Sequence, residues 1–319
     1  MGPVDKVVVG VDGSERSNMA LRWAVERLDP DGRLDVVYAL DPSSELVLAA
    51  LQQDSVPLRH RAERDLAGPW SEPARAAGLA PRCHVVEDDP SNGLLRVAEQ
   101  QGATLVVVGS HGAGGRHRPF VGSLTRNILH HATIPVVVVS SERAETVGPD
   151  IVGPDTVGPD TVGHDKASRH HPVVVGVSYG PASDRAAAWA SDYAAARDRP
   201  LHLLHTVSYR PVFPIDSPVD TLGSFLGPEV TVNWATADLD GMRDQILARH
   251  PGLDVSTRVE VGSAVRALID AGVDAEVVVV GKRQGDQVLR RTISPRLRQL
   301  IARASCPTAV VPSCPAPPS

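Results

Sequence analysis

Residues 105–140 read LVVVGSHGAGGRHRPFVGSLTRNILHHATIPVVVVS. The stretch begins with the apolar run Leu105–Val108 and ends with the similar run Val136–Val139. Such uninterrupted apolar runs are typical of strands that are buried on both faces of a parallel sheet. Between them, apolar residues recur at helical spacing directly after Gly122 and Ser123. A glycine-rich loop therefore joins the carboxyl end of a strand to the amino end of a helix, where free backbone N–H groups and the helix dipole favour an anion such as phosphate.

The loop contains the spacing G-x2-G-x9-G-S, formed by Gly109, Gly112, Gly122 and Ser123. The spacing lacks the Gly-Lys-Ser/Thr of a Walker A loop. It also differs from the dinucleotide motif G-x-G-x-x-G, which follows the first strand of its unit. The spacing resembles the nucleotide-binding signature of the universal stress protein family, and the resemblance extends over nearly all of residues 1–140.

The resemblance implies ATP, with or without Mg²⁺, as the ligand of this part of the chain. It implies that Asp12, which follows the first strand, contacts the ribose or the adenine, and that Ala39 lines the base. It also implies that the N–H groups of Ser123 and Leu124 bind phosphate. Arg116 either reaches the γ-phosphate or is solvated. The expected site residues are Gly10, Val11, Asp12, Ala39, Gly109, His111, Gly112, Arg116, Gly122, Ser123 and Leu124. The sequence departs from the family at Asp88 and Asp89, where a glycine is common, so the ribose side of the site stays open.

The bulk composition excludes several classes of protein. The 319 residues are 42% hydrophobic but only 3% aromatic, so the cores are expected to consist of Val, Leu, Ala and Ile. The formal net charge of −6 argues against nucleic-acid binding. Three cysteines are too few for a disulfide framework or a metal site. No apolar run has membrane-spanning length and the first residues enter a strand, so we expect a soluble, cytoplasmic protein without membrane partners.

The first 140 residues predict five strands that alternate with helical segments. The strands are expected at 6–11, 34–40, 81–86, 105–108 and 136–139, and Gly68-Pro69 is expected to break the helical segment before the third. This alternation is typical of parallel βαβ units and therefore of a doubly wound, Rossmann-like α/β sheet. The family resemblance adds the strand order 3-2-1-4-5. Ligands of such sheets bind at the carboxyl ends of strands, where Asp12 and Gly109 both lie.

The pattern then repeats. Val173–Val177 matches Val7–Val11 at an offset of 166 residues, and Val277–Gly281 matches Leu105–Gly109 at an offset of 172. We therefore expect two tandem five-stranded domains, at 1–142 and 172–312. The connecting segment 143–171 contains the tandem pentapeptides TVGPD, IVGPD, TVGPD and TVGHD, whose composition favours a solvated linker. Residues 313–319 are proline-rich and are expected to be disordered.

The second copy departs from the first at the nucleotide signature. At the matching offsets Asp12 becomes Ser178, Gly112 becomes Gln284, and Gly122-Ser123 becomes Ser294-Pro295. A proline at a helix start offers no N–H to a phosphate but suits the first turn of the helix. We therefore expect the second domain to keep the fold and to have lost the nucleotide site. The alternative is binding through a rearranged loop.

The sequence favours an ATP-binding regulatory protein in stress response. The alternatives are a nucleotide-independent protein-interaction module and a slow ATPase, because no spacing indicates a catalytic or metal-binding constellation. Val136–Val139 and Ala309–Val311 are apolar edge-type strands at the end of each domain. An exposed apolar edge favours pairing, so we expect a homodimer or intramolecular domain pairing through these strands.

Overall fold

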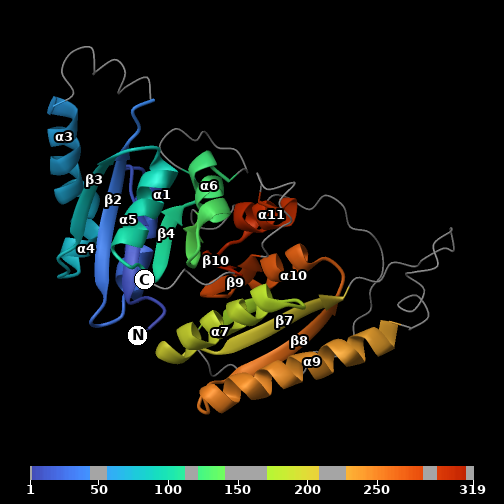
Figure 1. Cartoon of the computed structure of the whole chain (residues 1–319). Helices are drawn as coiled ribbons and strands as arrows, with labels where there is room; N and C mark the ends of the chain where they lie inside the picture. Colours follow the sequence, from blue (N-terminus) through green and yellow to red (C-terminus); the bar gives the residue numbers. More distant parts are fainter. Residues whose placement is uncertain are drawn as a thin grey trace, which may run out of the picture.

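The computed structural model describes residues 2–43, 56–111, 121–140, 171–207, 228–282 and 293–313 (Figure 1). Strands and helices alternate in both halves of the chain. The elements of the first half are β1 (Lys6–Gly10), α1 (Glu15–Arg27), β2 (Arg33–Leu40), α3 (Val56–Ala67), the 3₁₀ turn η1 (Pro69–Ser71), α4 (Glu72–Ala76), β3 (Arg82–Glu87), α5 (Pro90–Gln100), β4 (Leu105–Gly109), α6 (Ser123–His131) and β5 (Val136–Val139). The elements of the second half are β6 (Val173–Val177), α7 (Pro181–Ala196), β7 (Leu201–Val207), α9 (Pro228–Arg249), β8 (Val255–Val261), α10 (Ala264–Ala271), β9 (Val277–Lys282), α11 (Pro295–Arg303) and β10 (Thr308–Pro312).

The strands form one ten-stranded sheet in the order β3-β2-β1-β4-β5-β10-β9-β6-β7-β8. Within each half, neighbouring strands run parallel. The order 3-2-1-4-5 expected for the first domain is confirmed, and the second half repeats it in reverse across the sheet. Two doubly wound α/β units in tandem are therefore confirmed as the fold class.

The two halves meet at β5 and β10, which pair antiparallel. The register joins Val138 to Thr308, Val137 to Ala309 and Val136 to Val310. Because this pairing is antiparallel, the carboxyl ends of the second-half strands lie at the edge of the sheet where the first-half strands begin.

The apolar strands alternate their side chains between two helical layers. Val7 and Val9 of β1 pack in the cluster that also contains α1, whereas Val8 packs in the cluster that contains α5 and α6. This two-residue period explains why every position of the run is apolar, since both faces are covered by helices. Burying a valine side chain contributes about 1.5 kcal/mol or more, so these runs fix the sheet.

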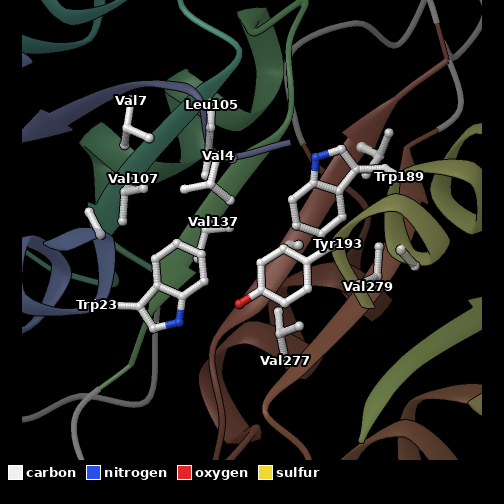
Figure 2. Packing of buried hydrophobic residues seen from close by; sticks show 14 of the residues in the cluster. Val4, Val7, Trp23, Leu105, Val107, Val137, Trp189, Tyr193, Val277 and Val279 are labelled. Atoms are coloured by element: carbon white, nitrogen blue, oxygen red, sulfur yellow. The ribbon is translucent and has the colours of Figure 1, made fainter. Parts of the chain in front are cut away.

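Three aromatic side chains gather where the halves meet on the α1 and α7 face of the sheet. Trp23 of α1 stacks parallel to Tyr193 of α7 at 6.4 Å between ring centroids, and Trp189 stacks on the other side of Tyr193 at 5.2 Å (Figure 2). All three rings are buried. The expectation that Val, Leu, Ala and Ile make up the cores therefore holds for the sheet but misses this aromatic contact.

A buried carboxylate, Glu276, joins the two halves beside these rings. Its side chain is 6% exposed, and Arg27 of the first half and Arg199 of the second approach its oxygens at 3.3 and 2.7 Å. The Tyr193 hydroxyl donates to the same carboxylate at 2.8 Å. Burial and the charge of Glu276 raise the pKa of Tyr193, so this hydroxyl keeps its proton. A buried carboxylate with several donors is satisfied. Removing either the carboxylate or its donors alone leaves buried polar groups unpaired and lowers the stability of the fold.

Other sequence expectations have mixed outcomes. The break at Gly68-Pro69 is confirmed, because α3 ends at Ala67 and a 3₁₀ turn starts at Pro69. The pentapeptide repeat at 146–165 and residues 314–319 lie outside the described residues. Among the helices that the structure describes, none is both long and apolar enough to cross a membrane.

Candidate functional site

The carboxyl end of β1 places Asp12 at the edge of the sheet. Val11 extends the pairing by one residue, since its N–H donates to the Val37 carbonyl at 2.9 Å. The Asp12 carboxylate accepts from the Ser14 N–H at 3.0 Å, and the Asp12 N–H donates to the Ser17 hydroxyl at 3.3 Å. Ser14 is also the N-cap of α1. Turn and cap together fix the position of the Asp12 carboxylate.

Two aromatic residues that sequence reasoning missed lie beside this turn. Gly13 has φ +77°, and a Cβ atom there would lie 2.7 Å from the Trp70 ring. Trp70 meets Tyr38 edge to face at 4.9 Å between ring centroids. Burial, then the charges of Asp12 and Asp65, raise the pKa of Tyr38. Because Trp70 lies in the 3₁₀ turn after α3, far from Gly13 in sequence, the sequence offered no signal that brings them together.

Gly109, at the end of β4, has a packing role that does not depend on a ligand. A Cβ atom at Gly109 would lie 3.1 Å from the backbone of Arg16 in α1. In the second half, a Cβ atom at Gly281 would lie 2.2 Å from the Ala182 carbonyl oxygen of α7. Glycine at this strand end lets the helix approach the sheet closely in both domains, and at Gly281 the backbone leaves no room for a Cβ atom. The presence of Gly109 alone therefore does not distinguish the two domains.

Gly10 and Ala39 face α5. A Cβ atom at Gly10 would lie 3.1 Å from the Leu94 side chain, and the Ala39 Cβ lies 3.8 Å from a Cβ built at Gly93. Small residues at these positions allow α5 to lie close to the ends of β1 and β2. Ala39 therefore lies on the same side of the sheet as α5 and α6, consistent with its expected place beside a base.

Asp88 and Asp89, which stand where a glycine is common in the family, serve the start of α5. Asp89 is the N-cap and accepts from the N–H groups of Ser91 and Asn92 at 3.0 and 3.1 Å. Burial raises the pKa of Asp89, but these hydrogen bonds and that of the Ser91 hydroxyl outweigh it, so the net shift is downward. Asp88 forms an ion pair with Arg96 at 2.9 Å. The N–H groups at the start of α5 are thus hydrogen-bonded by the helix's own N-cap, Asp89.

The start of α6, by contrast, has no side-chain cap among the residues that the structure describes. Its N-cap is Gly122, which offers no side-chain acceptor. The first bond within the helix runs from the Arg126 N–H to the Gly122 carbonyl at 3.0 Å. The N–H groups of Ser123, Leu124 and Thr125 therefore have no acceptor within α6. The Thr125 hydroxyl donates to the Gly109 carbonyl at 2.9 Å and ties this helix end to the end of β4.

The start of α11, at the matching place in the second half, is closed. Ser294 is its N-cap, and its hydroxyl accepts from the Leu297 N–H at 3.2 Å. Pro295 has no N–H. Among the described residues of the first turn, the N–H of Arg296 therefore lacks both a side-chain cap and an acceptor within the helix. Counting only bonds within each helix and to its cap among the described residues, three N–H groups lack an acceptor at the start of α6 and one at the start of α11.

Two side-chain nitrogens at the first-half site are buried without a partner among the described residues. They are Nε of Arg16 and Nε2 of His111. Nδ1 of His111 lies 3.3 Å from the Ser110 hydroxyl. Burial, then the charge of Arg16, lower the pKa of His111, so the ring is neutral near pH 7. Nε of Arg16 is a donor, so the missing acceptor there fits an anionic group. Arg16 was not expected from the sequence, because an arginine in a first helical turn is ordinary.

The structure brings most of the expected residues to one edge of the sheet. β1 and β4 are neighbours and run parallel, so Asp12 and His111 follow adjacent strand ends, and Thr125 holds the start of α6 against β4. Gly112 and Arg116 lie outside the described residues, as does Gln284 in the second half. The residues that sequence reasoning missed are Arg16, Tyr38 and Trp70.

Comparison with known proteins identifies the family. The model of the universal stress protein family matches residues 3–140 and again 170–312. The chain belongs to the universal stress protein family. A universal stress protein of Mycolicibacterium smegmatis is 26% identical over 321 residues, which cover 96% of each chain. A universal stress protein of Mycobacterium tuberculosis strain H37Rv is 27% identical over 296 residues, covering 87% of this chain and 86% of the relative.

A solved structure shares the tandem architecture. The crystal structure of a universal stress protein from Archaeoglobus fulgidus has a TM-score of 0.62 with 16% sequence identity, and the match covers 98% of this chain and 96% of the other. At this identity the likeness concerns the fold. Both halves of the chain therefore share this fold, and both match the family model.

Proposed function

We propose that this protein is an ATP-binding regulator in stress response and that the first domain alone holds the nucleotide. The observation that carries the proposal is the open start of α6, where the N–H groups of Ser123, Leu124 and Thr125 have no acceptor within the helix. A helix start of this kind attracts phosphate through its N–H groups and its dipole. The buried, unpartnered nitrogens of Arg16 and His111 support an anionic ligand at the same edge.

In this proposal, different residues bind the phosphates, the ribose and the base of the nucleotide. The start of α6 and Arg16 take the phosphates, since these groups carry N–H donors and positive charge. Asp12 takes ribose or adenine hydrogen bonds, because its carboxylate is fixed at the end of β1. Ala39 leaves room for the base on the α5 side of the sheet. Gly112 and Arg116 complete the phosphate side in this proposal, and Mg²⁺ accompanies the nucleotide if it binds as the magnesium complex. ATP as the ligand fits a cytoplasmic location.

The second domain is proposed not to bind nucleotide. Ser178 stands at the position of Asp12 and has no carboxylate. Its N–H donates to the Ser183 hydroxyl at 2.8 Å, just as the Asp12 N–H donates to the Ser17 hydroxyl. The turn is thus retained while the acidic group is lost. Together with the self-capped start of α11, this leaves fewer backbone donors for phosphate among the described residues of the second domain than at the start of α6.

We also propose that the two domains of one chain pair through β5 and β10 in solution. The antiparallel register between these strands supports it, as do the aromatic contact of Trp23 with Tyr193 and the buried Glu276. Each of the two strands satisfies the edge of the other, which removes the exposed edge that would favour a homodimer.

Calorimetric titration of the full-length protein with ATP tests the proposed function. We expect saturable binding that Asp12→Ala weakens and that Ser178→Ala leaves unchanged. Ser178→Ala is the matched control, because it alters the same turn in the domain proposed not to bind. Absence of ATP binding would favour the interaction module, which acts through its surfaces without nucleotide. Phosphate released over several turnovers would favour the slow ATPase.

A further inference from the structure

The last residue of β9, Lys282, connects the second domain to α6 of the first. It occupies the position that Ser110 holds in the first domain, 172 residues earlier, where the nucleotide loop begins. Its ammonium group donates to the carbonyls of Leu129 and His130 at 2.6 and 2.5 Å. The residue that would open a second nucleotide loop therefore contacts the first domain.

The topology of the sheet explains this contact. Since β5 and β10 run antiparallel, the carboxyl end of β9 lies at the edge where β5 begins. α6 ends just before β5, so its last turn lies at that same edge. Figure 1 shows α6 beside α11 where the two halves meet, and Ile128 and Ile301 of these helices share one buried cluster.

The two carbonyls are ones that α6 cannot satisfy by itself. The Ala132 N–H donates to the Ile128 carbonyl at 2.8 Å, and the carbonyls of Leu129 and His130 come after it in the last turn. The last carbonyls of a helix have no partner within it and carry the negative end of its dipole. A half-buried ammonium fits that place, although burial lowers the pKa of Lys282.

The opposite end of α6 is the start that presents N–H groups to the phosphates. The helix has nine residues, a length of about 14 Å. A helix this short is not stable alone, so its position depends on contacts at its two ends and on its buried face. Thr125 holds the first end to β4, and Lys282 holds the last turn.

We propose that Lys282 is a positioning residue for the ATP site of the first domain. The second domain has lost its own nucleotide loop and uses the first residue of that loop to hold the helix whose other end binds phosphate. This inference rests on the function proposed above. It gives the degenerate domain a role in the affinity of its partner domain.

A matched contact elsewhere in the interface supplies a control. The Ser140 hydroxyl, after β5, donates to the carbonyl of Ala304 at the end of α11 at 3.2 Å. This hydrogen bond also joins the two halves through a side chain and a helix carboxyl end, but it does not involve α6. Ser140→Ala therefore removes an interface contact without touching the helix that carries the site.

The experiment compares the full-length protein with Lys282→Met, Lys282→Arg and Ser140→Ala. ATP affinity is measured by calorimetry, and amide hydrogen exchange of α6 is measured without nucleotide. We expect Lys282→Met to weaken ATP binding by about threefold to tenfold, because a charge at a partly buried helix end contributes on that scale. Exchange should rise in α6 and not in α1. Lys282→Arg, which keeps a cation, should retain most of the affinity, and Ser140→Ala all of it.

The outcomes separate the two proposals. If wild type binds no ATP, the proposed function fails and this inference fails with it. If wild type binds ATP and Lys282→Met binds equally well, the inference alone is wrong. It is also wrong if Ser140→Ala weakens binding as much as Lys282→Met, since loosening of the interface then suffices. If Lys282→Met does not fold, Lys282→Gln is measured in its place under the same criteria.

Discussion

Moving the closed helix start of the second domain into the first should abolish ATP binding without destabilising the protein. The variant is Gly122→Ser with Ser123→Pro, which copies Ser294 and Pro295. The backbones are compatible, because Gly122 has φ −59° and ψ 158° and Ser294 has φ −58° and ψ 146°. Both conformations also suit a residue that precedes proline.

The magnitude follows from the N–H groups that are lost. Ser123→Pro removes one N–H, and a serine at 122 would accept from the Thr125 N–H as Ser294 does from that of Leu297. Each hydrogen bond to a charged group is worth about 1.5–3 kcal/mol, so losing two weakens binding by at least about 100-fold. Serine in place of glycine at an N-cap stabilises by a few tenths of a kcal/mol, and proline suits the first turn.

Calorimetry and thermal unfolding measure the two effects on the same samples. A Cβ at residue 122 would lie 3.3 Å from the Ser110 carbonyl oxygen, so a shift of a few tenths of an ångström is sufficient. The expected result is lost ATP binding with an unchanged melting temperature. A double variant that binds ATP like wild type would refute the reasoning, because the open start of α6 would then not be what holds the phosphates. Ser294→Gly in the second domain should leave binding unchanged, since Pro295 still lacks its N–H.

Three other changes have defined outcomes. Asp12→Ala should weaken ATP binding by about 1–3 kcal/mol in calorimetry, the scale for losing a charged hydrogen-bonding partner, and an unchanged affinity would remove Asp12 from the site. The pKa of His111 lies below its ordinary value of 6.5, so its unfolded state binds the proton first, and the free energy of unfolding should fall as the pH drops through 6.5. Urea unfolding at pH 7.5 and 5.5 should show a smaller fall in His111→Asn, and an equal fall would contradict the assignment. Glu276→Ala removes the buried acceptor that Arg27, Arg199 and the Tyr193 hydroxyl share and should cost about 3–5 kcal/mol in urea unfolding. A loss below about 1 kcal/mol would show that the carboxylate does not hold the halves together.

The fold could be predicted because its signals are local. Runs such as Val136–Val139 are apolar at every position only when helices cover both faces of the sheet, and the alternation with helical patterns determines the parallel units. The break at Gly68-Pro69 was equally visible, because proline lacks the N–H that a helix requires. The strand order came from the family resemblance, since neighbours such as β1 and β4 are about a hundred residues apart.

The candidate site was predictable only in part. Asp12 follows a strand end, and Gly122 and Ser123 begin a helix. Their positions in the fold could therefore be predicted from the sequence. The roles of Arg16 and Trp70 depend on contacts between segments far apart in sequence, and no periodicity encodes those contacts. Gly109 by itself does not identify a ligand site, because its close approach to α1 recurs at Gly281 and is explained by packing. Its role toward a ligand stays a prediction.

The contacts between the halves were beyond sequence reasoning for the same reason. Lys282 ends a strand, as many surface lysines do, and the antiparallel pairing of β5 with β10 is what brings it to the last turn of α6. Likewise, Glu276 precedes β9 as an ordinary polar residue would. Its burial becomes evident only when Arg27 of the other half is placed against it.

The central claim is that one chain holds one nucleotide, in the first domain. Native mass spectrometry of the full-length protein at saturating ATP measures this most directly, because it counts ligands per chain. The account predicts one ATP per chain for wild type and for Ser294→Gly, and none for the variant that carries Gly122→Ser with Ser123→Pro. Two ATP molecules per wild-type chain, or one that remains bound in the double variant, would contradict it.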